Sequence, residues 1–292
     1  MPARDPDPIL ALLKERIRSV FKHLPRALAG GESAVHQVRV ADRRLRVALP
    51  LLVKKPEGRR VKRALRALRV LARSAGLGRD LDVGVDLLEA HFESLDAVSE
   101  AQASVRQRLR AARSRSRHRM AESLLDMDIA RLRRDLRAIV SRGVEGLDVV
   151  FARLEEGRNH TGATVLTRIE SVGSRFEDEA LHGIRRHSRR LRYMAEIDER
   201  LQGAASDAPS LCKNLQERLG TIHDNHVLAN WLSSLAARCR SHGDVALGAE
   251  AWALATTFEE KSRGHHRDLL DQDPHAIVRR AMEEIGRARR AA

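Results

Sequence analysis

The sequence predicts an all-α protein built from two related halves. Apolar residues recur at intervals of three and four along nearly the whole chain, and alternating, strand-like runs are almost absent. An eleven-residue pattern, HxxRxxxRRLR, occurs at residues 36–46 and again at 182–192, an offset of 146 in a chain of 292 residues. We therefore expect one domain made of two pseudo-symmetric helical bundles (internal duplication) around a shared basic groove or channel. Its N-terminal half is residues 1–146 and its C-terminal half is residues 147–292.

Short stretches rich in glycine and proline divide the first half into successive helices. The glycine pair at 30–31, Pro56-Glu-Gly58 and Gly76-Leu-Gly78 interrupt the apolar periodicity, as turns between helices do. Helices are predicted at residues 7–28, 32–53, 57–74, 80–95, 98–124 and 129–141.

The second half is divided in the same way. Breaks are expected around residues 143–146, 203–209 and 273–274, where glycine, proline and aspartate gather. Helices are predicted at residues 147–157, 163–201, 208–220, 223–241, 244–271 and 275–290.

A second, weaker repeat supports the duplication. The pattern GxxxDxxV occurs at residues 76–83 and 220–227, an offset of 144. In each half it follows the HxxRxxxRRLR helix. Its glycine is expected to end one helix, and its aspartate, Asp80 or Asp224, is placed to cap the next.

The repeated HxxRxxxRRLR pattern places a row of cations along one face of a helix. At about 100° per residue, the histidine and three of the arginines of each copy fall within a stripe roughly 80° wide. The two stripes consist of His36, Arg39, Arg43 and Arg46, and of His182, Arg185, Arg189 and Arg192, with Arg44 and Arg190 on their flanks. Apolar residues occupy the opposite faces: Val38, Leu45, Leu49 and Leu52 in the first copy, and Ile184, Leu191 and Ala195 in the second.

Like charges this close repel one another, so a helix that needs only solubility would intersperse glutamate among them. The identical pattern in the second half therefore favours binding of an extended polyanion over a merely solvated basic face. Guanidinium groups suit this role, because their planar donors match phosphate oxygens. The neighbouring cations should keep His36 and His182 neutral, and bound phosphate should favour their protonation.

Composition narrows the choice of anionic partner. The net charge of +14 is compatible with nucleic acid, a membrane surface or a polyphosphorylated ligand. Only 3% of the residues are aromatic, and no aromatic cluster accompanies either stripe. Because single-stranded nucleic acids are commonly held on aromatic side chains, a partner without bases fits better. Nucleic-acid binding remains the alternative.

The remaining features indicate a cytoplasmic protein. Cys212 and Cys239 have no metal-like spacing and are expected to be small core residues of a reduced protein. Residues 1–10 lack the apolar core of a signal peptide. The longest apolar runs, such as 47–53, are too short to span a bilayer, so we expect no membrane association.

Other chemical signals are weaker. The run His223-Asp224-x-His226 resembles part of a phosphohydrolase metal site, but capping by Asp224 is the simpler interpretation. The pairs Asp80/Asp82 and Asp126/Asp128 are expected to be caps or first-turn carboxylates rather than Mg²⁺ ligands. Arginines follow one face of the 106–117 segment and also its opposite face, which is typical of a solvated helix, although this face could also extend the anion surface.

No sequence motif indicates catalysis. The patterns GxxxxGK[ST], HExxH and GxSxG are absent. We therefore expect no enzymatic activity and no cofactor. A metal-dependent phosphatase or polyphosphatase is the less favoured alternative.

At these residues the chain resembles the CHAD family, the conserved-histidine α-helical domain. The matching motifs are both HxxRxxxRRLR copies, Gly78-Arg-Asp-Leu-Asp-Val83, Leu191-Arg-Tyr193 and the KxLQxxLGxxxD pattern at 213–224. Their order and separations also fit, so the resemblance spans nearly the whole chain. It implies two four-helix bundles with pseudo-symmetry, binding of inorganic polyphosphate along a central basic surface, and association with polyphosphate granules in bacteria.

The resemblance also implies which residues bind phosphate. Carried over by motif, they are His36, Arg39, Arg43, Arg44, Arg46, His182, Arg185, Arg189, Arg190 and Arg192. The second copy of the glycine motif departs from the first, with Asn225-His226 in place of Leu81-Asp82. No ExExK signature of a triphosphate-tunnel domain occurs, so the chain looks like the binding module alone.

Overall fold

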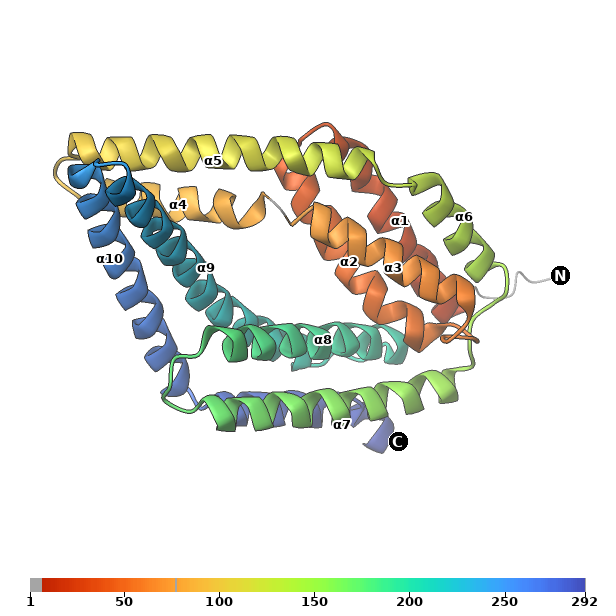
Figure 1. Ribbon diagram of the computed structural model, residues 1–292. Helices are drawn as coiled ribbons and strands as arrows, with labels where there is room; N and C mark the ends of the chain where they lie inside the picture. Colours follow the sequence, from red (N-terminus) through yellow and green to blue (C-terminus); the bar gives the residue numbers. More distant parts are fainter. Residues whose placement is uncertain (1–6, 77, 292) are drawn as a thin grey trace.

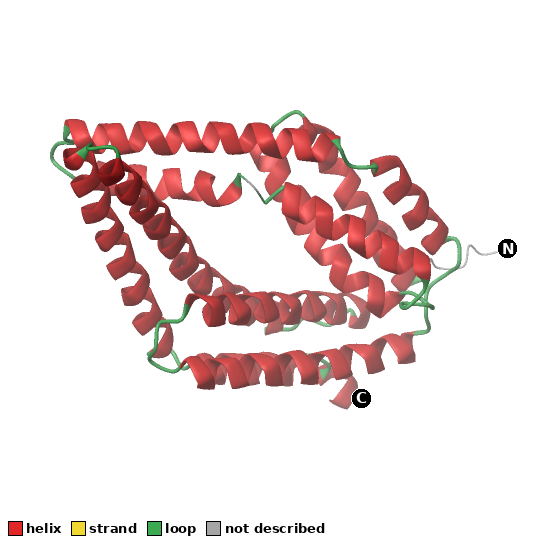
Figure 2. Ribbon diagram, viewed as in Figure 1, coloured by secondary structure: helices red, strands yellow, loops and turns green. Residues whose placement is uncertain are grey.

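The computed structural model describes residues 7–76 and 78–291, and within these ranges the chain forms α-helices and no β-strand (Figure 2). The predicted all-α class is confirmed. Two parts of the chain lie outside the described residues: residues 1–6 of the N-terminal segment, and Leu77 of the predicted Gly76–Gly78 break. The helices are α1 (Pro8–Leu28), α2 (Glu32–Leu52), α3 (Arg59–Ser74), α4 (Arg79–Glu93), α5 (Glu100–Leu125), α6 (Ile129–Val140), α7 (Leu147–Val172), α8 (Asp178–Gln202), α9 (Ala208–Ser241), α10 (Val245–Leu270), α11 (Pro274–Glu284) and α12 (Arg287–Ala291).

Side-chain caps begin several of these helices. Ser99 and Gln102 form a reciprocal capping box at the start of α5, which satisfies two backbone N–H groups that have no partner within the helix. Asp128 accepts a 2.8 Å hydrogen bond from the N–H of Arg131 at the start of α6. The prediction that Asp128 is a cap is therefore confirmed.

The predicted break between residues 157 and 163 is wrong. α7 runs without interruption from Leu147 to Val172 and ends where Gly173 adopts a φ of +48°. Gly162, inside the helix, allows close packing instead of a turn: a Cβ at this position would lie 2.1 Å from the sulfur of Met282 on α11. A glycine needed for close approach and a glycine needed for a turn look alike in the sequence.

The predicted break after Gly220 is also wrong, because α9 is a single helix from Ala208 to Ser241. Asp224 therefore caps nothing and lies in the middle of α9. In the first half the chain does break, and α4 begins at Arg79, but its N-cap is Gly78 and no side chain caps it. The capping role predicted for Asp80 is thus wrong as well.

The helices form three packed groups arranged like a frame (Figure 1). One group consists of α1, α2, α3 and α6, and a second of α7, α8, α11 and the first part of α9. These correspond to the expected pair of bundles. The third group, α4, α5, α10 and the second part of α9, combines helices of both halves and was not predicted. The internal duplication itself stays a prediction.

Two hydrophobic cores hold the frame together. The larger core runs through the first two groups, and the smaller one fills the third group, which α4 and α5 build with α9 and α10. Both cysteines are buried and unbonded, Cys212 in the larger core and Cys239 in the smaller one, as predicted. No helix among the described residues is long and apolar enough to cross a membrane.

The larger core fixes the orientation of α2 and α8. The apolar residues predicted to lie opposite the cationic stripes are all buried: Val38, Leu45, Leu49, Leu52, Ile184, Leu191 and Ala195. Burying the four on α2 contributes roughly 6–12 kcal/mol before the entropy cost of ordering them. With these faces buried, the cationic stripes must point away from the core.

Candidate functional site

The two cationic stripes meet in one cavity. α2 and α8 contact each other directly, and a cavity of about 660 Å³ opens between them and helices α3, α4 and α9. Seven of the ten predicted phosphate-binding residues line this central cavity: His36, Arg39, Arg43, Arg46, His182, Arg185 and Arg189. Residues 146 positions apart in the chain thus face a common space.

Arg190 lies in an adjoining cavity. That second cavity has a volume of about 340 Å³ and includes Arg186 and His187 in its lining. It shares Arg43, Arg189 and two further arginines with the central cavity. The two cavities are therefore continuous along a cationic wall.

Arg44 and Arg192 line neither cavity. Arg44 donates two hydrogen bonds to the carboxylate of Glu196, at 2.8 and 2.9 Å, and Arg192 donates one to the same carboxylate at 3.1 Å. Arg16 of α1 lies 3.6 Å from it. Since Glu196 binds cations from α1, α2 and α8, these two arginines join the helices, and the structure does not bring them to the other predicted site residues.

The central cavity also contains residues that the repeated pattern omits. Arg69 and Arg73 of α3, Arg79 of α4 and His223 of α9 line it. Arg69 and Arg73 lie four residues apart on the face of α3 opposite its buried residues, and this spacing could have identified them. Arg79 belongs to the matched glycine motif, but no periodicity links it to the stripes.

Cations greatly outnumber carboxylates in the cavity wall. Among the described residues, eight arginines line the wall, against two carboxylates, Asp80 and Asp224. Asp224 lies 3.7 Å from Arg185, and Arg46 donates a 2.9 Å hydrogen bond to the buried Asp42. Much of the positive charge therefore faces the cavity without compensation.

Three stripe arginines have no ion-pair partner in the part of the chain that the structure describes. No described carboxylate lies within 4.0 Å of Arg39, Arg43 or Arg189. The Nε of Arg43 is buried and finds no hydrogen-bond acceptor among the described residues. A buried donor without a partner is costly, and an oxyanion in the cavity would supply the missing acceptor.

The pKa values of the cavity residues reflect this excess of positive charge. Burial, followed by the guanidinium groups of Arg79 and Arg43, lowers the pKa of His36. Burial and the neighbouring His223 lower the pKa of His182. The direction agrees with the neutral histidines expected from the sequence. Burial and the adjacent Arg43 likewise lower the pKa values of Arg39 and Arg189.

The residues of the motifs considered for metal binding contact other side chains. His223 lies 3.5 Å from Asp178, and no group of three or more His, Cys, Asp or Glu side chains in the described ranges is placed to hold a metal ion. Asp80 faces the central cavity, whereas Asp82 accepts a 2.8 Å hydrogen bond from Arg117 on α5. The two carboxylates of this pair therefore have different surroundings, one at the cavity and the other in an ion pair with α5.

The arginine stripe on α5 is largely paired. Arg110 lies 2.7 Å and Arg106 3.8 Å from Glu89 of α4, and Arg117 contacts both Asp82 and Glu32. These contacts join α5 to α4 and to the start of α2. None of these arginines lines the central cavity.

Comparison with known proteins identifies relatives. The family model of the CHAD domain matches residues 11–233. Two curated proteins of Mycobacterium tuberculosis, Uncharacterized protein MT2285 (strain CDC 1551 / Oshkosh) and Uncharacterized protein Rv2226 (strain ATCC 25618 / H37Rv), are each 27% identical over 251 residues. The alignments cover 82% of this chain and 47% of each relative, so the chain spans about half the length of the curated relatives it matches.

A solved structure shares the fold. The crystal structure of the CHAD domain from the plant Ricinus communis matches with a TM-score of 0.59 and 19% identity, over 94% of this chain and 90% of that one. At this identity the likeness concerns the arrangement of helices alone.

Proposed function

We propose that this chain, which belongs to the CHAD domain family, binds inorganic polyphosphate in the central cavity and along the adjoining cavity. The family is linked to polyphosphate binding in general. The observation that carries the proposal for this chain is the meeting of both cationic stripes in one cavity with few carboxylates. The binding residues would be the seven stripe residues there, Arg190 next to them, and Arg69, Arg73 and Arg79.

The proposed mechanism is electrostatic. Successive phosphates would accept charge-assisted hydrogen bonds from arginines on opposite walls, which relieves the repulsion among Arg39, Arg43 and Arg189. Because the central and adjoining cavities share four arginines, a linear ligand can contact both without leaving the cationic wall. This continuity favours a polymer over a single phosphate.

Polyphosphate fits the cavity better than nucleic acid does. Among the described residues, no phenylalanine, tyrosine or tryptophan lines the central cavity, and Tyr193 is the one such residue in the adjoining cavity, so bases would find little aromatic surface on which to stack. A polymer of phosphate alone requires only donors and positive charge. The proposed role is binding without catalysis, together with recruitment to polyphosphate granules in the cytoplasm.

The decisive experiment neutralises one arginine from each stripe. Arg43→Gln combined with Arg189→Gln should weaken binding of long-chain polyphosphate about 100-fold or more, because each charge-assisted hydrogen bond contributes roughly 1.5–3 kcal/mol. Arg200→Gln with Arg238→Gln removes the same net charge from exposed positions outside both cavities and should change affinity little. Equal losses in the two double variants would refute the site.

Competition separates polyphosphate from the nucleic-acid alternative. Titrated polyphosphate should displace bound single-stranded RNA or duplex DNA at far lower phosphate concentration than the reverse. Affinity should also fall steeply with salt, as for other polyanions that release counterions on binding. If nucleic acid proves the stronger competitor at equal phosphate concentration, the choice of polyphosphate is wrong.

A further inference from the structure

The adjoining cavity leads to a row of cations on the surface of α8 and α7. Arg186, His187 and Arg190 of α8 line this cavity, and both arginines are exposed. Arg168 of α7 lines neither cavity, but it lies near His187, because α7 and α8 pack side by side (Figure 1). We call these four residues the outer track.

The outer track and the cationic stripe occupy different faces of α8. Gly183, Arg186, His187 and Arg190 follow the spacing i, i+3, i+4 and i+7, so they share one face of the helix. Three stripe residues each precede a residue of this face by one position, which places the two faces about 100° apart. α8 thus presents cations both to the central cavity and toward α7.

Gly183 makes room for Arg168 on this face of α8. A Cβ at residue 183 would lie 2.7 Å from the Nη1 and 3.2 Å from the Cζ of Arg168. The guanidinium group of α7 therefore lies directly over the backbone of α8, one turn from Arg186. Burial, followed by Arg186 and Arg168, lowers the pKa of His187, so both arginines are close to this histidine.

The arginines of the outer track are not paired with carboxylates. Within the described ranges, no carboxylate lies within 4.0 Å of Arg168, Arg186 or Arg190. Toward the start of α8, the same face next carries Glu179, one turn before Gly183. An anion that follows this face is therefore repelled by Glu179 and attracted toward Arg168 on α7.

The outer track is not part of the repeated pattern. At the offset of 146, Val40 and Ala41 of α2 take the places of Arg186 and His187. The first half thus has apolar residues where the second half has cations. The charge of the outer track therefore adds to the charge that the two stripes already bring to the central cavity.

The opposite end of the central cavity is less suited to a polyanion. Asp80 and Asp224 line the central cavity but not the adjoining one. Burial, with a smaller contribution from Asp80, raises the pKa of Asp224, so the two carboxylates are close together. Asp178 lies nearby, 3.5 Å from His223. A chain too long for both cavities would therefore leave through the adjoining cavity.

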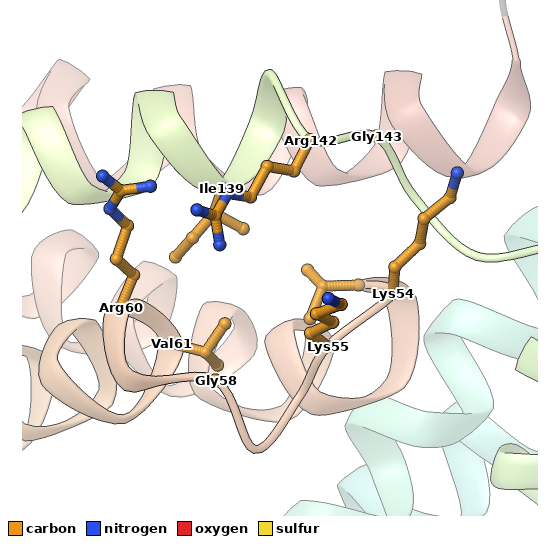
Figure 3. Close-up of a pocket in the computed structure, with 9 residues that line it drawn as sticks. Lys54, Lys55, Gly58, Arg60, Val61, Ile139, Arg142 and Gly143 are labelled. Atoms are coloured by element: carbon orange, nitrogen blue, oxygen red, sulfur yellow. The ribbon is translucent and has the colours of Figure 1, made fainter.

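A third cavity, of about 340 Å³, is cationic but lies off this path (Figure 3). It shares no lining residue with the central or adjoining cavity. Its cations are Lys54, Lys55, Arg60 and Arg142, all of them exposed. Because it is separate from the proposed site, it supplies a control for effects of charge alone.

We infer that the outer track binds the part of a long polyphosphate chain that extends beyond the two cavities. This inference rests on the proposed function. Phosphates that leave the adjoining cavity would pass Arg190 and Arg186 and accept charge-assisted hydrogen bonds from Arg168. Contacts made by one linked chain reinforce each other, so the outer track would make affinity depend on chain length.

Binding titrations with polyphosphates of graded length test this inference. Arg168→Gln should weaken binding of long chains by roughly three- to tenfold, as expected for one partly exposed hydrogen bond, and leave tripolyphosphate binding unchanged. Comparing variant and wild type at equal length cancels the larger number of positions at which a long chain can bind. Arg43→Gln with Arg189→Gln should weaken binding of both ligands.

Arg142→Gln at the third cavity is the matched control. It removes the same charge and should change long-chain affinity by less than about twofold. Equal losses for tripolyphosphate and long chains in Arg168→Gln, or no loss for either, would overturn the outer track. If the Arg43/Arg189 variant still lost binding, the proposed function would stand. A wild-type protein that bound no polyphosphate would overturn both.

The salt dependence of binding gives a second measure. For long chains, the slope of log affinity against log salt concentration should be smaller in Arg168→Gln by about 0.7, the value for one phosphate contact on a single strand. For tripolyphosphate the slope should match that of the wild type. An unchanged slope for long chains would show that Arg168 contacts no phosphate.

Gly183→Ala tests the position of Arg168 without changing the charge. The added methyl group displaces the end of a flexible side chain, so the thermal unfolding temperature should not fall. Long-chain affinity should decrease as in Arg168→Gln, by a smaller factor, and tripolyphosphate affinity should stay the same. Long-chain affinity equal to that of the wild type would overturn the role assigned to Arg168 over α8.

Discussion

Arg189 lies beside Arg43 and Arg185 with no carboxylate partner among the described residues, so the free protein keeps like charges close together at a cost in stability. The core faces of α2 and α8 hold them there, since the apolar residues behind each stripe are buried. Binding an anion and stabilising the empty fold are therefore opposing requirements at this position.

Neutralising Arg189 should separate these two requirements. Arg189→Gln should raise the free energy of unfolding of the ligand-free protein by roughly 0.5–2 kcal/mol, because it relieves repulsion, while it weakens polyphosphate binding. Urea denaturation and binding titrations measure both quantities. Arg44→Gln is the contrasting variant: it leaves Glu196 with fewer partners and should lower stability. A stability loss in Arg189→Gln would show that its charge is compensated in the free protein.

The histidines of the stripes should make binding depend on pH. Burial and neighbouring cations lower the pKa values of His36 and His182, so both are neutral in the free protein at pH 7. Bound phosphate favours the imidazolium, so binding takes up protons and affinity should increase as the pH falls from about 8 to 6. The stability of the ligand-free protein depends on pH in the opposite direction. As the pH falls below about 6.5, the unfolded chain binds protons more readily than the folded protein, so the free energy of unfolding decreases.

Titrations at several pH values check this expectation. His36→Gln with His182→Gln should flatten the dependence of affinity on pH, whereas His118→Gln, an exposed histidine on α5, should leave it unchanged. A dependence that persists in the first variant would place the titrating group elsewhere.

Helical spacing predicted which face the stripe residues occupy but not what each one contacts. Arg39 and Arg43 face the cavity as expected, whereas Arg44, beside them, binds Glu196, which lies 152 residues away in the chain. A partner this distant depends on how α2 packs against α8, and the periodicity of one helix contains no information about that packing.

At the scale of helices, the two copies of the GxxxDxxV pattern have different surroundings. The first follows α3, which ends at Ser74, and continues into α4, which begins at Arg79, whereas the second lies inside the continuous helix α9. Gly76 leaves room for the side chain of Arg39, since a Cβ at residue 76 would lie 2.6 Å from the Nη1 of that arginine. Gly220 has more space: its nearest neighbour is the Nη2 of Arg185, at 3.4 Å from an added Cβ.

Gly220→Ala should therefore stabilise the protein by up to about 1 kcal/mol, since alanine is the better helix former and the new contact is an ordinary one. Gly203→Ala is the matched control: Gly203 follows α8 with a φ of +68°, so alanine there should destabilise by a similar amount. Denaturant unfolding of both variants measures the difference. Destabilisation by Gly220→Ala would contradict a continuous α9.

At the scale of the whole molecule, the sequence predicted the fold class, most helix boundaries and the convergence of the stripes. It did not predict the third group of helices. That group depends on contacts of α4 and α5 with α9 and α10, which lie more than a hundred residues further along the chain. Apolar periodicity shows that each of these helices buries a face, and only the assembled structure shows which faces meet.

The interleaving of the halves predicts that neither folds alone. The larger core contains residues of both halves, and the smaller core joins α4 and α5 to α9 and α10. Fragments 1–146 and 147–292, produced separately, should show reduced helicity and no cooperative unfolding, because each exposes core surface that the other covers. Produced together, they should co-purify and bind polyphosphate. Circular dichroism monitors the thermal unfolding of each fragment. Cooperative unfolding of either fragment alone would contradict this prediction, because it would show that the half is an independent folding unit. A recent duplication of a stable bundle would require such independence.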